Sequence, residues 1–242
     1  MKKIFLLIVA FSFCSFPAFA EPAHFVAWGD EEGVVKRKGD DLNEKNPALP
    51  FLKKRLEELD KTNKIDAILH TGDFVRFDPN ENYYKEFLGR FLERFYPTVG
   101  GDQEFFMARY ANFINSVPHL KFLYFDRVAQ DGNGLELYYH AIVHDVHLIS
   151  LYNPDEYREP ERSPQYIGQN IFINKNIPQF KWLDSLLQRI RVYAKDERPI
   201  IVLSHGPVFN SSKLLTELFA KYKVNLVIAG DFHILAHKSY KD

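Results

Sequence analysis

The part of the chain that decides the fold is the stretch Ile65-Asp66-Ala67-Ile68-Leu69-His70-Thr71-Gly72-Asp73. Its apolar run, Ile65 to Leu69, has the length and composition of a buried strand. Thr71-Gly72-Asp73 follows directly, and open α/β sheets bind their ligands at the carboxyl ends of such strands. The glycine before the carboxylate permits a tight turn and a close approach of the backbone. The stretch therefore predicts a buried strand with Asp73 at its carboxyl end, in position to bind a ligand.

Four further apolar runs end in the same way. Their polar clusters are Gly29-Asp30-Glu31-Glu32, Gly101-Asp102-Gln103-Glu104, Ser204-His205-Gly206-Pro207 and Gly230-Asp231-Phe232-His233. A single aspartate after a strand is more often a helix cap than a ligand, but caps do not explain five clusters at five strand ends. Because carboxylates and imidazoles are ligands of divalent metals, the clusters predict a metal centre.

The segments between these strands have helical period. Helices are expected at residues 50–61, 81–94, 105–115, 180–193 and 213–222, and the first of them would place Phe51, Leu52, Leu56 and Leu59 on one face. Tyr138–Val143 and Val146–Leu151 flank His144-Asp145 and predict a tight hairpin, and residues 153–178 are expected to form a long surface loop. Helices that alternate with strands predict an α/β domain of two sheets flanked by helices.

Length and charge exclude several classes of protein. With 242 residues the chain is long enough for one domain and too short for two ordinary ones. The 31 basic and 32 acidic residues leave a net charge of −1, which argues against nucleic acid as a partner. The single cysteine, Cys14, can form neither an internal disulfide nor a Cys-rich zinc site.

The first residues have the pattern of a secretory signal peptide. Two lysines precede the apolar run Ile4 to Phe13, and Ala18-Phe19-Ala20 has the small-x-small pattern of a cleavage site. The run is too short to span a hydrocarbon core of about 30 Å, which argues against a membrane anchor. A lipoprotein signal at Cys14 is disfavoured because bulky Phe13 precedes it. We therefore expect residues 1–20 to be a signal peptide, residues 21–242 to form a single domain without a membrane span, and the mature protein to be periplasmic or secreted.

The five clusters together resemble the calcineurin-like metallophosphoesterases, in particular their purple acid phosphatase-like branch. The series in that family is Asp-x-His, Gly-Asp, Gly-Asn-His-Asp/Glu, a lone His and Gly-His-x-His. The matching positions here, in the same order, are Asp30, Gly72-Asp73, Gly101-Asp102-Gln103-Glu104, His205 and Gly230-Asp231-Phe232-His233. The resemblance covers essentially the whole mature chain and implies an α/β/β/α sandwich.

Several positions depart from the family pattern. Asp30, Asp73, His205 and His233 match it directly, whereas Glu32, Asp102, Gln103 and Asp231 stand where the family has His, Asn, His and His. A second register of the third block would place Asp102 at the position of the family's histidine; we prefer the register anchored on Glu104. Arg76 stands where purple acid phosphatases carry a metal-binding tyrosine, which argues against an iron–tyrosinate centre.

The resemblance implies a metal set and a role for each position. Asp30, Glu32 and His233 would hold one divalent metal, Asp102, His205 and Asp231 the other, and Asp73 would bridge the two. Gln103, at the catalytic position, could donate a hydrogen bond to the phosphoryl group but could not give up a proton. Because the ligands are rich in carboxylate, Mn²⁺ or Mg²⁺ is favoured, Ca²⁺ or Fe is possible, and zinc is disfavoured.

Two functions of different class are compatible with this pattern. The first is a secreted phosphoesterase that hydrolyses a small phosphate ester with metal-activated water at a dinuclear site. The second is a degenerate, non-catalytic member of the family that acts as a metal-containing binding module.

Three histidines surround the predicted hairpin. On one strand His140 and His144 would share a face, so a further metal is conceivable; ordinary hydrogen-bonded histidines are the favoured interpretation.

Overall fold

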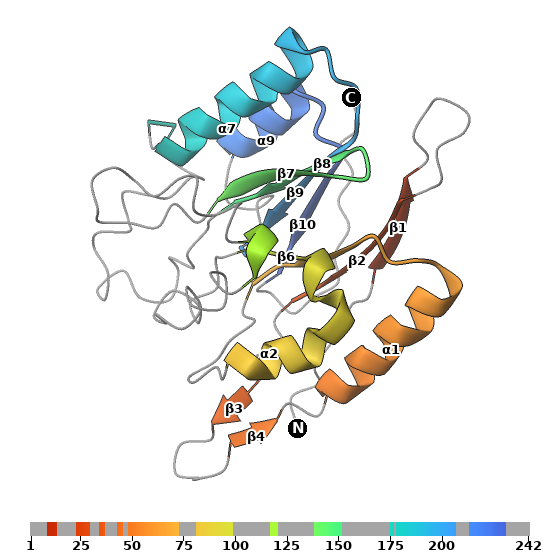
Figure 1. Ribbon diagram of the computed structural model, residues 1–242. Coiled ribbons are helices and arrows are strands. Elements are labelled where there is room, and N and C mark those ends of the chain that lie inside the picture. Colours follow the sequence, from red (N-terminus) through yellow and green to blue (C-terminus); the bar gives the residue numbers. More distant parts are fainter. Residues whose placement is uncertain are drawn as a thin grey trace.

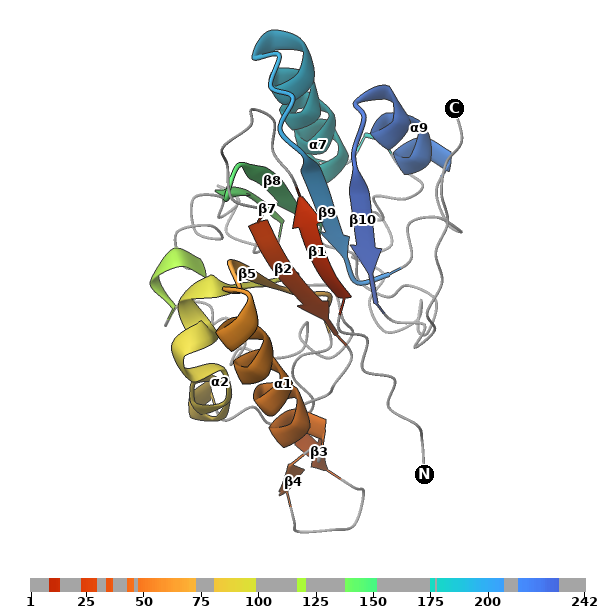
Figure 2. The ribbon, with the colours of Figure 1, turned by 90° about the vertical axis from the view of Figure 1, so that its right-hand side faces the viewer.

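The computed structural model describes residues 9–13, 23–29, 34–36, 43–45, 48–72, 81–98, 117–120, 138–151, 175–176, 178–206 and 213–230. In this part of the chain two four-stranded sheets pack face to face, and helices cover the outer face of each sheet (Figures 1 and 2). The expected α/β/β/α layering is therefore confirmed.

The first sheet has the strand order β1-β2-β5-β6. It consists of β1 (Val9–Phe13), β2 (Ala23–Trp28), β5 (Ala67–His70) and β6 (Phe95–Pro97). β2, β5 and β6 are parallel, and their register aligns Trp28 with His70 and His70 with Pro97. These three strands consequently end at one edge of the sheet.

The second sheet has the order β10-β9-β8-β7. Its strands are β7 (Tyr139–Val143), β8 (Val146–Ser150), β9 (Ile200–Ser204) and β10 (Leu226–Ala229). β8, β9 and β10 are parallel, whereas β7 and β8 form the predicted antiparallel hairpin. His144 and Asp145 have φ values of 47° and 60°, which is the backbone that a two-residue hairpin turn requires.

Three apolar cores hold the layers together. α1 (Ala48–Thr62), α2 (Glu81–Leu88) and the 3-10 segment Gly89–Arg94 pack on the first sheet, where Leu52, Leu56 and Phe91 meet Val26 and Ile68. α7 (Pro178–Gln188), the π-helical turn Arg189–Tyr193 and α9 (Lys213–Lys221) pack on the second. The third core lies between the sheets and is lined by alternate residues of the facing strands.

The structure corrects several details of the sequence-based expectations. Phe51 is 57% exposed, because the buried face of α1 follows Leu52 and Leu56 at a spacing of four residues. The helix expected at 81–94 changes to 3-10 geometry after Leu88. A short antiparallel pair, β3 (Val34–Lys36) and β4 (Asn43–Lys45), was not predicted. The helix expected at 105–115 and nearly all of the loop expected at 153–178 lie outside the described residues.

The apolar N-terminal run contributes a strand to the first sheet. Val9–Phe13 pairs antiparallel with β2 and occupies the edge position next to it. None of the described helices is both long and apolar enough to cross a membrane.

Candidate active site

The parallel strands of each sheet remain bound to one another just beyond their carboxyl ends. In the first sheet the Thr71 amide donates to the Trp28 carbonyl at 2.9 Å, and the Thr98 amide donates to the His70 carbonyl at 2.7 Å. In the second sheet the Gly230 amide donates to the His205 carbonyl at 2.9 Å. The exits of neighbouring strands are therefore held side by side.

Hydrogen bonds also join the carboxyl ends of the two sheets to each other. His205 Nδ1 lies 2.9 Å from the carbonyl oxygen of Thr71, which is 134 residues away in the sequence. The Thr98 hydroxyl donates to the Leu151 carbonyl at 2.8 Å, and the Tyr139 hydroxyl donates to the Pro97 carbonyl at 2.9 Å. The two sheets thus present one common edge.

Two glycines allow this close approach. A Cβ atom on Gly29 would lie 2.0 Å from Thr71 Oγ1, and a Cβ atom on Gly72 would lie 2.6 Å from His205 Nδ1. Gly72 also has a φ of +100°, which side chains rarely permit. The ends of β2, β5 and β9 therefore meet at a distance that only glycine allows.

The hydrogen bond of His205 determines its tautomer. A backbone carbonyl can only accept, so Nδ1 carries the proton and donates it to Thr71. In the neutral ring Nε2 then carries the lone pair, which is the arrangement of metal-binding histidines whose other nitrogen donates to a backbone carbonyl. His205 is 1% exposed. The tautomer, the burial and the glycine-lined approach fit a metal ligand.

The structure places the predicted site residues as follows. His205 is described and lies at the common edge. Asp30, Asp73 and Asp231 each follow a described glycine directly, and these glycines (Gly29, Gly72 and Gly230) are held at that edge by the contacts given above. Those three aspartates, together with Glu32, Asp102, Gln103 and His233, lie outside the described residues. Within the described ranges no group of three potential metal ligands gathers.

His70, the last residue of β5, was missed by the sequence analysis. It is fully buried, and its Nδ1 lies 3.1 Å from the Gly72 amide. The available signal was a histidine within an otherwise apolar strand that ends at a predicted site.

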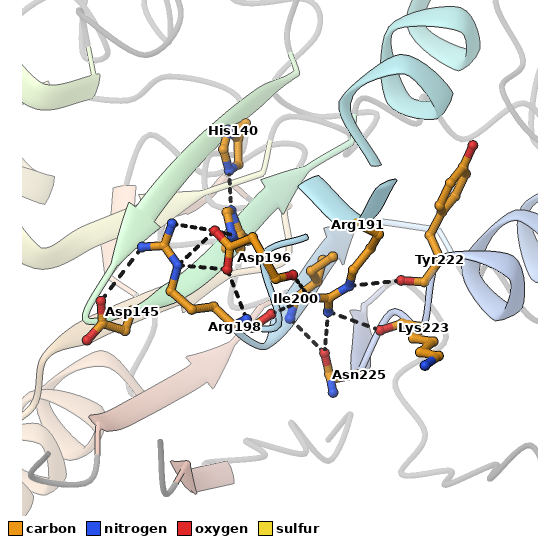
Figure 3. Close-up of polar contacts among 10 residues, drawn as sticks. His140, Asp145, Arg191, Asp196, Arg198, Ile200, Tyr222, Lys223 and Asn225 are labelled. Atoms are coloured by element: carbon orange, nitrogen blue, oxygen red, sulfur yellow. Dashed lines mark hydrogen bonds and ion pairs between the residues drawn. The ribbon is translucent and has the colours of Figure 1, made fainter. Parts of the chain in front are cut away.

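A second polar network lies at the opposite ends of the second-sheet strands, near the hairpin turn (Figure 3). His140 Nε2 lies 2.9 Å from His147 Nδ1, and His147 Nε2 lies 3.0 Å from Asp196 Oδ2. Arg198 donates to both oxygens of Asp196 and forms an ion pair with Asp145 at 3.7 Å. In the same region Arg191 donates to the carbonyls of Arg198 and Tyr222.

Arg198 and burial determine the charge states of Asp196 and His147 in this network. The bidentate bond from Arg198 holds the pKa of Asp196 far below its usual range. Burial lowers the pKa of His147 despite its contact with Asp196. A neutral His147 then donates from Nε2 to Asp196, and its Nδ1 accepts from His140.

These contacts decide between the two interpretations of the histidines at the hairpin. The rings of His140 and His147 are stacked at 5.2 Å and joined directly by a hydrogen bond. His144 lies in the turn, where its Nε2 is 3.0 Å from Asp66 Oδ1. The second of the two alternatives, ordinary hydrogen-bonded histidines, describes this region.

Fold and site together define a layered α/β protein in which the carboxyl ends of strands from two sheets meet at one common edge. The family model described as calcineurin-like phosphoesterase matches residues 41–235, which is more than half of the chain. The chain belongs to this family of metallophosphoesterases, which are hydrolases.

Other comparisons are distant. No curated protein sequence matches the chain. A solved structure, purple acid phosphatase PPD1 from yellow lupin (Lupinus luteus) seeds, shares 16% sequence identity with a TM-score of 0.44. That match covers 87% of this chain and 40% of the lupin chain, so this chain spans less than half of that protein's length.

Proposed function

We propose that the chain is a metal-dependent phosphoesterase that hydrolyses a small phosphate ester at a dinuclear site on the common edge of the two sheets. The observation that carries the proposal is the hydrogen bond from His205 Nδ1 to the Thr71 carbonyl, beside Gly72. This bond directs Nε2 of the buried His205 ring away from Thr71, as in a metal-binding histidine, and the ring lies directly against Gly72, the residue before Asp73.

The proposed ligands are Asp30, Glu32 and His233 for one metal and Asp102, His205 and Asp231 for the other, with Asp73 shared by both. When bound, two divalent ions supply Lewis-acid chemistry, in that they lower the pKa of water and neutralise charge on the phosphoryl group. Carboxylate-rich ligands favour Mn²⁺ or Mg²⁺ over zinc.

Gln103 limits the reaction to what a neutral amide can do. Its amide can donate a hydrogen bond to a phosphoryl oxygen, but it has no proton to transfer to the leaving oxygen when the ester P–O bond breaks. We therefore expect esters whose leaving group departs readily as an anion to be the better substrates.

The proposal includes export through residues 1–20. Cleavage after Ala20 would remove β1, which holds only an edge position, and would leave β2 intact from its first residue, Ala23. The family match, which starts at residue 41, does not include the removed segment. N-terminal sequencing of the protein from a periplasmic fraction is expected to begin at Glu21, and a chain that retains residues 1–20 would refute the export.

The decisive experiment is hydrolysis of an aryl phosphate by the metal-depleted protein after addition of Mn²⁺. We expect turnover in the wild type and none in Asp73→Asn. Asp184→Asn is the matched control, because Asp184 lies on α7 and bonds to the Tyr222 hydroxyl at 2.8 Å, away from the proposed site. If the wild type binds Mn²⁺ but hydrolyses no ester, the proposed enzymatic function is wrong and the protein is a metal-containing binding module.

A further inference from the structure

His70 is a buried polar residue three positions before Asp73, and the proposed function gives its side chain no role. It is 0% exposed, and burial of an imidazole is costly unless its nitrogens are hydrogen-bonded. Its Nδ1 is 3.1 Å from the Gly72 nitrogen. Since an amide N–H can only donate, Nδ1 must be the acceptor, and the neutral ring carries its proton on Nε2.

Aromatic neighbours on both adjacent strands hold the ring of His70 in place. Trp28 on β2 meets it edge-on, with ring centroids 5.8 Å apart and an interplanar angle of 87°. Phe95 on β6 lies 5.6 Å away at 49°. Both neighbours are themselves buried. Nδ1 is therefore an acceptor whose position is set by the packing of three parallel strands.

The group that His70 binds is one half of a peptide unit that His205 binds from the other side. The Gly72 N–H and the Thr71 C=O belong to the same planar peptide bond. The N–H donates to His70 Nδ1 at 3.1 Å, and the C=O accepts from His205 Nδ1 at 2.9 Å. One plane thus links two histidines with opposite tautomers, and each bond polarises the peptide in the direction that strengthens the other.

We propose that His70 is a positioning residue of the metal site. It fixes the rotation of the Thr71–Gly72 peptide plane, and that plane in turn orients the His205 ring and sets the backbone from which Asp73 extends. The inference rests on the proposed function for the identity of the ligands. The two histidine bonds to the Thr71–Gly72 peptide, called the peptide clamp below, are present in the metal-free protein.

Two substitutions of similar shape separate the hydrogen bond from the packing. His70→Asn keeps an acceptor on Cγ at the position of Nδ1, whereas His70→Leu places a methyl group there. Both leave out the outer part of the ring, so their packing losses are comparable. Removal of a group that supports a metal ligand typically weakens metal affinity by about 10–100-fold. We expect that loss of Mn²⁺ affinity in His70→Leu and its recovery to within a few-fold of the wild type in His70→Asn.

Measurements on the metal-free protein test the clamp independently of the ligand set. We expect slow hydrogen exchange of the Gly72 amide and the ¹⁵N signature of an Nδ1-protonated His205 ring in the wild type and in His70→Asn. Both should change in His70→Leu. If that variant does not fold, His70→Gln takes its place, since Gln carries no acceptor at the Nδ1 position.

The outcomes are distinguishable. Equal exchange of the Gly72 amide and equal His205 signatures in the acceptor-free and acceptor-bearing variants would overturn the inference, and so would equal Mn²⁺ affinities of these variants. A wild type that binds no Mn²⁺, yet shows the expected exchange and tautomer, would refute the proposed function and leave the peptide clamp standing.

Discussion

Substitution of Gly72 by alanine perturbs the candidate site through a single added atom. The new Cβ would lie 2.6 Å from His205 Nδ1 and 3.0 Å from His205 Cγ. Neither atom is the far end of a flexible side chain, because His205 is buried and bonded to Thr71. The ring must therefore move away, and the hydrogen bond to the Thr71 carbonyl is lost.

The expected magnitude follows from two separate costs. A residue with a Cβ at positive φ costs roughly 1–2 kcal/mol. Leaving the buried Thr71 carbonyl and the His205 N–H unpaired adds about 1–3 kcal/mol. For a chain of this size, 1 kcal/mol lowers the melting temperature by about 2–4 °C.

Gly89 offers a matched control for the first cost. It also has a positive φ, +50°, but a Cβ placed there meets no atom within 4 Å. Gly89→Ala therefore has the backbone strain without the collision.

The assay is thermal unfolding of both variants in the absence of metal, followed by titration with Mn²⁺. We expect Gly72→Ala to melt below Gly89→Ala by about 4–8 °C, which corresponds to about 2 kcal/mol, and to bind Mn²⁺ more weakly. Identical melting temperatures and Mn²⁺ affinities for the two variants would show that His205 does not contact Gly72.

Three further predictions concern metal, pH and substrate. Mn²⁺ at a hundredfold excess over its dissociation constant should raise the stability of the wild type by about 2.7 kcal/mol, with a smaller gain in Asp73→Asn than in Glu32→Gln; equal gains in the two variants would contradict the bridging role of Asp73. The pKa of Asp196 is lower in the folded protein than in the unfolded chain. The ionised carboxylate therefore stabilises the folded state above the unfolded pKa of about 3.9, and this stabilisation is lost as the pH falls through the folded pKa. Asp196→Asn should accordingly reduce the loss of unfolding free energy at acid pH, measured by urea unfolding. Glu32, Asp102 and Asp231 add negative charge where the family has neutral ligands, and a monoester carries close to −2 at neutral pH, so the ratio of kcat/KM for an aryl diester over the matching monoester should fall in Asp231→His; a ratio that does not move would refute the charge argument.

Most of the secondary structure could be predicted from the sequence because its signals are local. The apolar runs at β2, β5, β9 and β10 and the helical periods of α1, α7 and α9 depend only on residues within one element. The two-residue hairpin turn was likewise visible between two apolar runs, although it contains neither Gly nor Asn; its side chains are instead tied to Asp66 and Arg198.

The tertiary structure alone decided which strand ends meet and which group each buried histidine contacts. His205 and Thr71 are 134 residues apart, and nothing within either segment specifies that a ring nitrogen of one reaches a carbonyl of the other. The same holds for His70 and His147, which both lie in apolar strands in the sequence. His70 contacts the amide of the Thr71–Gly72 peptide, whereas His147 contacts Asp196 at the opposite end of its sheet.

The sequence by itself determined most of the elements, the layering and the residue types at the strand ends, because strand and helix periods act over a few residues. Only the packed sheets decided that Gly72 must lack a side chain and that His205 carries its proton on Nδ1. The physical reason is that steric exclusion and tautomer choice are settled by atoms within about 3 Å, and in this fold those atoms come from different sheets.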